Sequence, residues 1–201
     1  MFNNKEDHIY KIIVVGEIGT GKTSLIRRIV HNKFSENIQP TIGINFVKYN
    51  IDWVSNTKIE LQLWDIAGNT DKSWLTRMYY ASASAALVLF DMNNMNSFKE
   101  IKNWKRDIDD KVVTSKNQHI PCLLIGNKSD ICDWNKSQEE MNKFCKHNGF
   151  LHFFKVSTRE NRNVKESLNY LLNYITENEV QPEILQSIDI LNSERPKKCC
   201  I

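Results

Sequence analysis

Short apolar runs along the chain predict six strands. Two of these runs, at 85–90 and 120–125, are continuously apolar, which is typical of strands buried on both faces of a sheet. The run at 58–64 alternates apolar with polar positions and follows the turn signal Ser55-Asn56, so it predicts a hairpin with the strand before it. The full set of predicted strands is 9–15, 44–53, 58–64, 85–90, 120–125 and 150–156.

Apolar residues spaced three and four positions apart predict helices between these strands. Ser97 is predicted to cap the helix that carries Phe98, Ile101, Trp104 and Ile108 on its inner face. The predicted helices run to about residue 31 after the first strand, over about 72–80, from Ser97 past Ile108, over 137–147 and from Val164 to about Ile175.

Strands that alternate with helices predict an α/β fold with a six-stranded, mostly parallel sheet and helices on both faces. The hairpin adds one antiparallel edge strand. In such sheets ligands bind beyond the carboxyl ends of the strands, so polar segments that follow strand ends are expected to converge on one site.

Length and composition limit the domain organisation, the class of partner and the cellular compartment. The 201 residues predict a flexible N-terminus at 1–8, one domain at 9–176 and a tail at 177–201. The net charge of +3 does not indicate a nucleic-acid partner, and five cysteines without a C-x-x-C pair favour a reducing compartment. Residues 1–10 carry no apolar signal-peptide core, and no apolar run is long enough to span a bilayer.

The segment at 16–24 has the phosphate-binding loop pattern, placed after a predicted strand and before a predicted helix. Its glycines permit close approach, so backbone N–H groups can point inward at phosphate oxygens. Lys22 can reach the outer phosphates, and the Thr23 hydroxyl can ligate Mg²⁺. The loop consists of Gly16, Glu17, Ile18, Gly19, Thr20, Gly21, Lys22, Thr23 and Ser24.

The segment Asn127-Lys128-Ser129-Asp130 follows a buried strand and narrows the nucleotide to GTP or GDP. A carboxylate at Asp130 can accept from the ring N–H and the exocyclic amine of guanine, a pair of donors that adenine lacks on that edge. Asn127 can bond the base or brace the loop, and the Lys128 stem can lie over the ring. The motif argues against the competing prediction of an ATP-using phosphotransferase.

With these motifs in this order, the chain resembles a small GTPase of the Ras superfamily, and within it the Rab family, over about residues 9–176. The resemblance implies the P-loop NTPase small-G-protein fold. Three stretches are most similar to the Rab subgroup of lysosome-related organelles, namely Glu17-Ile18-Gly19, Trp64-Asp65-Ile66 and Asn103-Trp104-Lys105. The other matching segments are Pro40-Thr41-Ile42-Gly43, Ala67-Gly68 and Ser157-Thr158-Arg159.

The resemblance also implies a switch built around the γ-phosphate. Thr41 would ligate Mg²⁺ and touch the γ-phosphate, Asp65 would hold Mg²⁺ through water, and the Gly68 N–H would donate to the γ-phosphate. Loss of that phosphate would release both loops.

Further roles are implied for the base and for partner proteins. Phe34 would pack against the guanine, Ser157 would support the base loop, and the Thr158 N–H would donate to the guanine carbonyl beside Arg159, which replaces a common lysine. An aromatic triad of Phe46, Trp64 and Tyr79 would present the nucleotide state to effectors, with hairpin or core packing as the alternative for Phe46.

The chain departs from the family at Asn69, where a glutamine usually orients the attacking water. Asparagine has the same amide on a side chain one methylene shorter, so we expect a GTP hydrolase with a low intrinsic rate. Thr70 and Asp71 replace further familiar residues. A nucleotide-loaded scaffold that hardly cycles is the alternative function.

The tail is acidic from 177 to 194 and ends in Lys197-Lys198-Cys199-Cys200-Ile201. This end is not a C-a-a-X motif but is similar to the double-cysteine ends of Rabs, where both thiols are geranylgeranylated. The resemblance implies a monomer on the cytoplasmic face of an endosomal, lysosome-related or vesicular membrane that cycles with the cytosol. The implied partners are an exchange factor, a GTPase-activating protein, Rab escort protein, GDP-dissociation inhibitor and effectors, with no nucleic acid.

Overall fold

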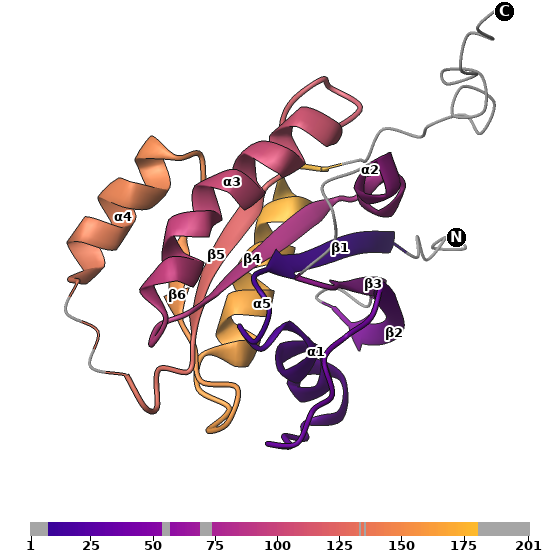
Figure 1. Cartoon of the computed structure of the whole chain (residues 1–201). Coiled ribbons are helices and arrows are strands. Elements are labelled where there is room, and N and C mark those ends of the chain that lie inside the picture. The colour runs from indigo at the N-terminus through magenta and orange to yellow at the C-terminus, as the bar shows by residue number, and fades with distance from the viewer. Residues whose placement is uncertain (1–7, 54–56, 69–73, 133, 135, 181–201) are drawn as a thin grey trace, which may run out of the picture.

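A computed structural model of the chain describes residues 8–53, 57–68, 74–132, 134 and 136–180. Strands and helices alternate through most of this part of the chain (Figure 1). The elements are β1 (His8–Gly16), α1 (Lys22–His31), β2 (Ile44–Asp52), β3 (Lys58–Ile66), α2 (Trp74–Tyr80), β4 (Ala85–Asp91), α3 (Met95–Lys111), β5 (Cys122–Asn127), α4 (Gln138–His147), β6 (Phe153–Lys155) and α5 (Val164–Glu177).

The strands form one six-stranded sheet in the order β2-β3-β1-β4-β5-β6. β1 is parallel to both of its neighbours, β3 and β4, and the pairs β4–β5 and β5–β6 are parallel as well. Only β2 runs antiparallel, against β3 at the edge of the sheet. The predicted α/β architecture, with its antiparallel edge strand, is therefore confirmed.

Two hydrophobic cores cover the two faces of the sheet, because successive side chains of each strand point to opposite faces. Ile13 and Val15 of β1 face the core that includes residues of α2, α3 and α4, whereas Ile12 and Val14 face the core shared with α1 and α5. Figure 1 shows the sheet running between these helices. The central strands are buried on both sides, which accounts for their continuous apolar runs.

The start of α3 and the length of β6 differ from the sequence prediction. The cap of α3 is Asn94, whose Oδ1 accepts from the backbone N–H groups of Asn96 and Ser97. Ser97 lies inside the helix, where its hydroxyl bonds the backbone of Asp91 and Asn94. β6 spans only 153–155 rather than 150–156, and β5 begins at Cys122.

Other predicted boundaries agree with the structure more closely. Ser137 caps α4 through a capping box with Glu140, and Asn148 and Gly149 end that helix. The turn signal Ser55-Asn56 lies outside the described residues. Within the part of the chain that the structure describes, no helix has the length and apolar character to cross a membrane.

The carboxyl ends of four parallel strands meet at one edge of the sheet. Gly16 ends β1, Ile66 ends β3, and Asp91 and Asn127 lie opposite each other at the ends of β4 and β5. The loops that follow these strands carry the motifs found in the sequence, so the fold brings them to a common site.

Candidate nucleotide-binding site

Lys22 lies at the start of α1 and points back into its own loop. Its Nζ donates to the carbonyl oxygens of Gly16 at 2.8 Å and of Glu17 at 3.0 Å. Burial lowers the pKa of Lys22 to about 8, while the carboxylates of Asp65 and Glu17 act in the opposite direction. The loop therefore holds a buried ammonium group at the positive end of a helix, an arrangement suited to binding phosphate.

Two glycines of the site lie where a side chain would collide with neighbouring groups. Gly21 has a φ of 94°, and a Cβ there would meet the amide nitrogen of Asn127. A Cβ at Gly68 would meet the backbone of the phosphate loop at Gly16, Glu17 and Ile18. Gly68 thus lies directly against the loop, as the predicted contact of its N–H with a phosphate requires.

Three side chains from separate segments form an oxygen-rich cluster beside Lys22. Thr23 Oγ1 donates to Asp65 Oδ2 at 2.6 Å and lies 2.8 Å from Thr41 Oγ1, which also donates to Asp65 Oδ2 at 3.2 Å. The other oxygen, Asp65 Oδ1, is buried without a hydrogen-bond partner among the described residues.

Hydroxyl and carboxylate oxygens are the ligands that Mg²⁺ prefers, so these residues fit the ion. An unsatisfied buried carboxylate oxygen is also the kind of group that a cation or its bound water would satisfy. The described ranges hold no group of three or more His, Cys, Asp or Glu side chains arranged for a metal, and this cluster contributes one carboxylate with two hydroxyls.

The base-recognition motif is braced from two sides. Ser157 Oγ donates to Asp130 Oδ1 at 2.6 Å, which fixes the carboxylate that would read the guanine. Asn127 is fully buried, and its amide donates to Thr20 O at 2.9 Å. Of the two roles left open for Asn127, the structure places it as a brace between the base loop and the phosphate loop.

Both backbone polar groups of Thr158, its N–H and its carbonyl, form hydrogen bonds with other protein groups. Its N–H donates to Asn127 Oδ1 at 3.2 Å, so the guanine contact expected for this N–H would have to be shared with Asn127. Its carbonyl accepts from Arg28 Nε at 2.9 Å, and the carbonyl of Arg159 accepts from the same guanidinium at 2.9 Å. Arg28 on α1 therefore clamps the loop that follows β6.

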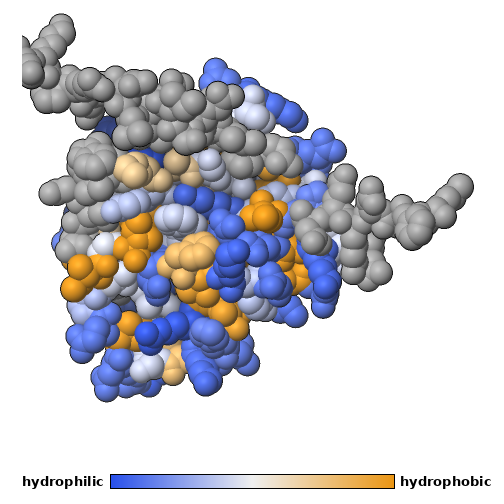
Figure 2. Space-filling view, turned by 90° about the vertical axis from the view of Figure 1, so that its right-hand side faces the viewer, coloured by the Kyte–Doolittle hydropathy of each residue, from blue (hydrophilic) through white to orange (hydrophobic). Residues whose placement is uncertain are grey.

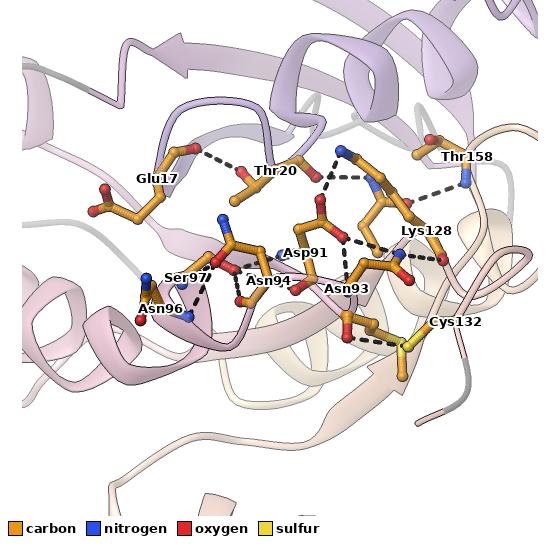
Figure 3. Close-up of polar contacts among 12 residues, drawn as sticks. Glu17, Thr20, Asp91, Asn93, Asn94, Asn96, Ser97, Lys128, Cys132 and Thr158 are labelled. Atoms are coloured by element: carbon orange, nitrogen blue, oxygen red, sulfur yellow. Dashed lines mark hydrogen bonds and ion pairs between the residues drawn. The ribbon is translucent and has the colours of Figure 1, made fainter. Parts of the chain in front are cut away.

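Lys128 is held over the site by the end of β4 (Figure 3). Its Nζ lies 2.7 Å from Asp91 Oδ2, and its φ of 63° is left-handed. Asn93 links the two residues, since its side-chain amide donates to Asp91 Oδ1 at 3.2 Å and to Lys128 O at 3.4 Å. The ion pair fixes the direction of the Lys128 stem.

One cavity of about 420 Å³ joins the phosphate loop to the base motif. Segment 34–41 forms part of its wall, and Arg159 bonds Glu36 of that segment at 2.7 Å. The predicted site residues that line the cavity are Ile18, Gly19, Gly21, Lys22, Thr23, Ser24, Phe34, Thr41, Gly68, Asn127, Lys128, Asp130, Thr158 and Arg159. Those that support it from behind are Gly16, Glu17, Thr20, Asp65 and Ser157.

The predicted aromatic triad is only partly tied together by direct contact. Phe46 and Trp64 meet edge to face with ring centroids 5.4 Å apart, and Trp64 and Tyr79 pack against the same core. Phe46 is 43% exposed and Ile42 is 94% exposed. Figure 2, which views the side of the molecule toward β2 and β3, shows hydrophobic residues interspersed among hydrophilic ones.

Asn69, Thr70, Asp71, Cys199 and Cys200 lie outside the described residues, so their predicted roles remain predictions.

Three residues of the site were not identified from the sequence, namely Arg28, Asp91 and Trp104. Asp91 was open to detection, because it is a polar residue at the carboxyl end of a buried strand. Arg28 and Trp104 carry no such signal, since each sits in an amphipathic helix pattern. Trp104 Nε1 donates to Glu17 Oε1 at 2.9 Å across 87 positions of sequence.

Comparison with known proteins matches the chain to one family. The sequence pattern of the Ras family matches residues 11–177. Ras-related protein Rab-32A of Dictyostelium discoideum is 42% identical over 190 residues, covering 90% of this chain and 87% of the relative. Ras-related protein Rab-32 of Homo sapiens is 37% identical over 207 residues, with 96% and 90% covered. Ras-related protein Rab-7L1 of Homo sapiens is 36% identical over 175 residues, with 87% and 86% covered.

Proposed function

The chain belongs to the Ras family, in its Rab branch of small GTPases, and from this premise we propose that it is a membrane-anchored switch that hydrolyses GTP slowly. The observation that carries the proposal is the single cavity into which both Lys22 and Asp130 open. A phosphate-binding cation at one end and a guanine-reading carboxylate at the other match the two ends of one nucleotide.

At the phosphate end, the loop supplies positive charge before the ligand arrives. The carbonyls of Gly16 and Glu17 hold the Lys22 ammonium in place, so it needs little reorganisation to meet phosphate oxygens. The Gly68 N–H is proposed to donate to the γ-phosphate, which makes its segment sensitive to loss of that group. Thr41 is proposed to do the same for the segment between α1 and β2.

Thr23, Thr41 and Asp65 would hold Mg²⁺, with Asp65 acting through water. When bound, the ion neutralises phosphate charge and orients the outer phosphates. Their existing hydrogen bonds keep the three oxygen atoms together, so little side-chain ordering remains to be done on binding.

At the base end, Asp130 would accept the two guanine donors while the Ser157 hydroxyl holds its Oδ1 in position. Lys128, fixed by Asp91, would cover one face of the ring, and Phe34, which also lines the cavity, would pack against the guanine. Arg159 would close the loop over the base through its ion pair with Glu36.

Hydrolysis would depend on Asn69 to orient the attacking water, with Lys22 balancing the charge on the phosphates. The shorter side chain of Asn69 supports the proposal of a low intrinsic rate and leaves room for a partner protein to complete the site. A scaffold that stays loaded with nucleotide is the second candidate, favoured by the same substitution.

The double cysteine at 199 and 200 supports geranylgeranyl anchoring of the switch to an intracellular membrane, since two lipid chains give stable attachment. We place the protein on endosomal, lysosome-related or vesicular membranes in trafficking. There it would meet exchange factor, GTPase-activating protein and effectors through the switch segments. Rab escort protein and GDP-dissociation inhibitor would handle its lipids during cycling with the cytosol.

Nucleotide selectivity tests this function. The purified protein is expected to retain GDP or GTP, and equal ATP should not displace it. Asp130→Asn should lower the affinity for GDP and raise that for xanthosine diphosphate, because the amide can donate to the carbonyl that replaces the guanine amine. Asp110→Asn, an exposed change on α3, is the matched control. Displacement of GDP by ATP, or unchanged selectivity in Asp130→Asn, would contradict the proposal.

A further inference from the structure

A side chain of α3 is bonded directly to the phosphate loop. Trp104 Nε1 donates to Glu17 Oε1 at 2.9 Å. The two residues come from stretches that follow different strands, β1 and β4, and meet only in the folded chain. An indole N–H is a donor only, and a carboxylate is an acceptor only, so the contact has one possible direction.

Glu17 is bonded on both its backbone and its side chain. Its backbone carbonyl accepts from Lys22 Nζ at 3.0 Å and from Thr20 Oγ1 at 2.8 Å, so it forms part of the inner framework of the loop. Its side chain reaches the opposite way, to α3. Figure 3 shows the bond between the Glu17 carbonyl and Thr20. Fixing the carboxylate therefore also fixes the peptide group that supports Lys22.

The α3 end of this contact is rigid. Trp104 is only 2% exposed, and its helical neighbours Ile101 and Ile108 are fully buried against the sheet. The loop end is different, because Gly16 and Gly19 lie in backbone conformations that glycine adopts without strain. A fixed donor on α3 thus bonds a loop whose backbone path depends on glycine conformations.

Glu17 is also the one acidic residue within the phosphate loop. A carboxylate free to turn toward the cavity would repel the phosphates of a nucleotide. Trp104 holds it on the far side of the loop, where its charge still favours the protonated form of Lys22.

We propose that Trp104 is a positioning residue for nucleotide binding, which acts through Glu17 to hold the phosphate loop open for phosphate. This inference rests on the proposed function, since it concerns the same site. It assigns to α3 a part in retaining the nucleotide, although α3 contributes no residue to the wall of the cavity.

Release of fluorescently labelled GDP from the full chain in excess Mg²⁺ tests the role. Trp104→Phe keeps an aromatic ring but removes the donor, and we expect release about threefold to tenfold faster, the effect of one partly buried hydrogen bond. Trp134→Phe is the matched control. Trp134 packs against Phe90 and Phe98, and its Nε1 has no hydrogen-bond partner in the described part of the chain. Release from this control should stay within about twofold of wild type.

A double-mutant cycle separates the contact from any general loss of packing. Glu17→Ala should also speed release, and the double variant with Trp104→Phe should release no faster than the faster single variant, because both changes remove the same bond. The indole proton signal of Trp104 should also shift in Glu17→Ala, which reports that the hydrogen bond exists in solution, while the release rates report whether it acts on the nucleotide.

Unchanged release in Trp104→Phe, or additive effects in the double variant, would overturn the inference. A wild-type protein that retains no guanine nucleotide would instead overturn the proposed function. The two failures are distinguishable. A release rate can be measured only on protein that has bound labelled GDP, whereas failure of the proposed function is a wild-type protein that binds none.

Discussion

The side-chain amide of Asn127 donates to the carbonyl of Thr20 at 2.9 Å, joining segments 107 positions apart. The contact is possible only because Gly21 has no side chain at the point where Asn127 passes. The same amide accepts the N–H of Thr158 through its oxygen. One buried residue therefore connects the phosphate loop, the base motif and the loop after β6.

Asn127→Asp should disrupt all three segments at once. The new oxygen would face the Thr20 carbonyl, placing two acceptors together in a buried site at a cost of about 1–3 kcal/mol or more. Because this cost weakens the site, we expect GDP release to become about tenfold faster or more. The thermal midpoint of unfolding should also fall. Stopped-flow release and differential scanning calorimetry measure the two effects.

The control for that change is Asn173→Asp on the exposed face of α5. It makes the same chemical substitution away from the site and should alter neither quantity. If the two variants have the same GDP release rate and the same thermal midpoint, the hydrogen bonds of Asn127 contribute nothing measurable to either property.

Nucleotide affinity should fall as the pH rises past about 8. Burial lowers the pKa of Lys22 to about 8 in the ligand-free protein, while phosphate binding favours its charged form. Binding above that pH must therefore take up a proton, and the affinity can fall by up to about tenfold per pH unit. Calorimetric titration of GDP in buffers of different ionisation enthalpy measures this uptake directly.

The same shift has a consequence for stability. Because the unfolded chain keeps the Lys22 proton up to its usual pKa of 10.5, the ligand-free protein gains stability between about pH 8 and that value. Lys11 titrates near the same pH, with a pKa lowered to about 8 by burial, but it lies on the Trp64 ring outside the cavity. Lys11→Arg should therefore leave the proton uptake on GDP binding intact. Loss of that uptake in the Lys11→Arg variant would contradict its assignment to Lys22.

A buried polar contact between α2 and α3, made by Lys111, should contribute measurably to the free energy of unfolding. Lys111 Nζ pairs with Asp107 at 2.6 Å and donates to the fully buried Thr76 of α2. The Lys111 and Asp107 side chains are only 13% and 10% exposed, so Lys111→Met leaves a carboxylate nearly buried and unpaired. We expect a loss of about 1–3 kcal/mol in the free energy of unfolding, measured by urea titration.

Lys48→Met is the comparison for that variant. Lys48 pairs with Glu60 at 3.0 Å but is 56% exposed, so its loss should cost less than about 1 kcal/mol. A Lys111 variant no less stable than the Lys48 variant would show that the buried polar contact is energetically neutral.

The intrinsic rate of GTP hydrolysis should rise in Asn69→Gln. The longer side chain would place the amide where a water can be oriented, and a displacement of about 1 Å is worth on the order of a hundredfold in rate. Single-turnover hydrolysis measures the change, with Asn142→Gln on the exposed face of α4 as the control. No increase would refute this account of Asn69, and a rate near zero in both proteins would favour the nucleotide-loaded scaffold.

Membrane attachment should depend on Cys199 and Cys200 together. Replacing both with serine should abolish incorporation of a prenyl precursor and move the protein to the soluble fraction, because no lipid would remain. Cys132→Ser, a half-buried position whose Sγ contacts Met92 O, should keep the label. Unchanged membrane partition in the double variant would rule out this anchor.

The sequence alone was enough to predict the alternating α/β fold and the ends of most elements. Continuous apolar runs identified β4 and β5 because both of their faces are buried, and the alternation in β3 identified the hairpin edge. The start of α3 was predicted three residues late, at Ser97, because Asn94 and Ser97 are both good capping residues. Only backbone geometry decides which of them stands at the helix end.

The sequence also determined the chemistry of the site, since glycine, lysine, hydroxyl and carboxylate groups at fixed spacing are local properties of the chain. What the tertiary structure decided is which distant side chains restrain that chemistry: Trp104 on Glu17, Asp91 on Lys128, and Arg28 on the backbone of Thr158. These partners lie 87, 37 and 130 positions apart. Such contacts form only when the strands have paired and the helices have packed on the sheet, so no local pattern in the sequence encodes them.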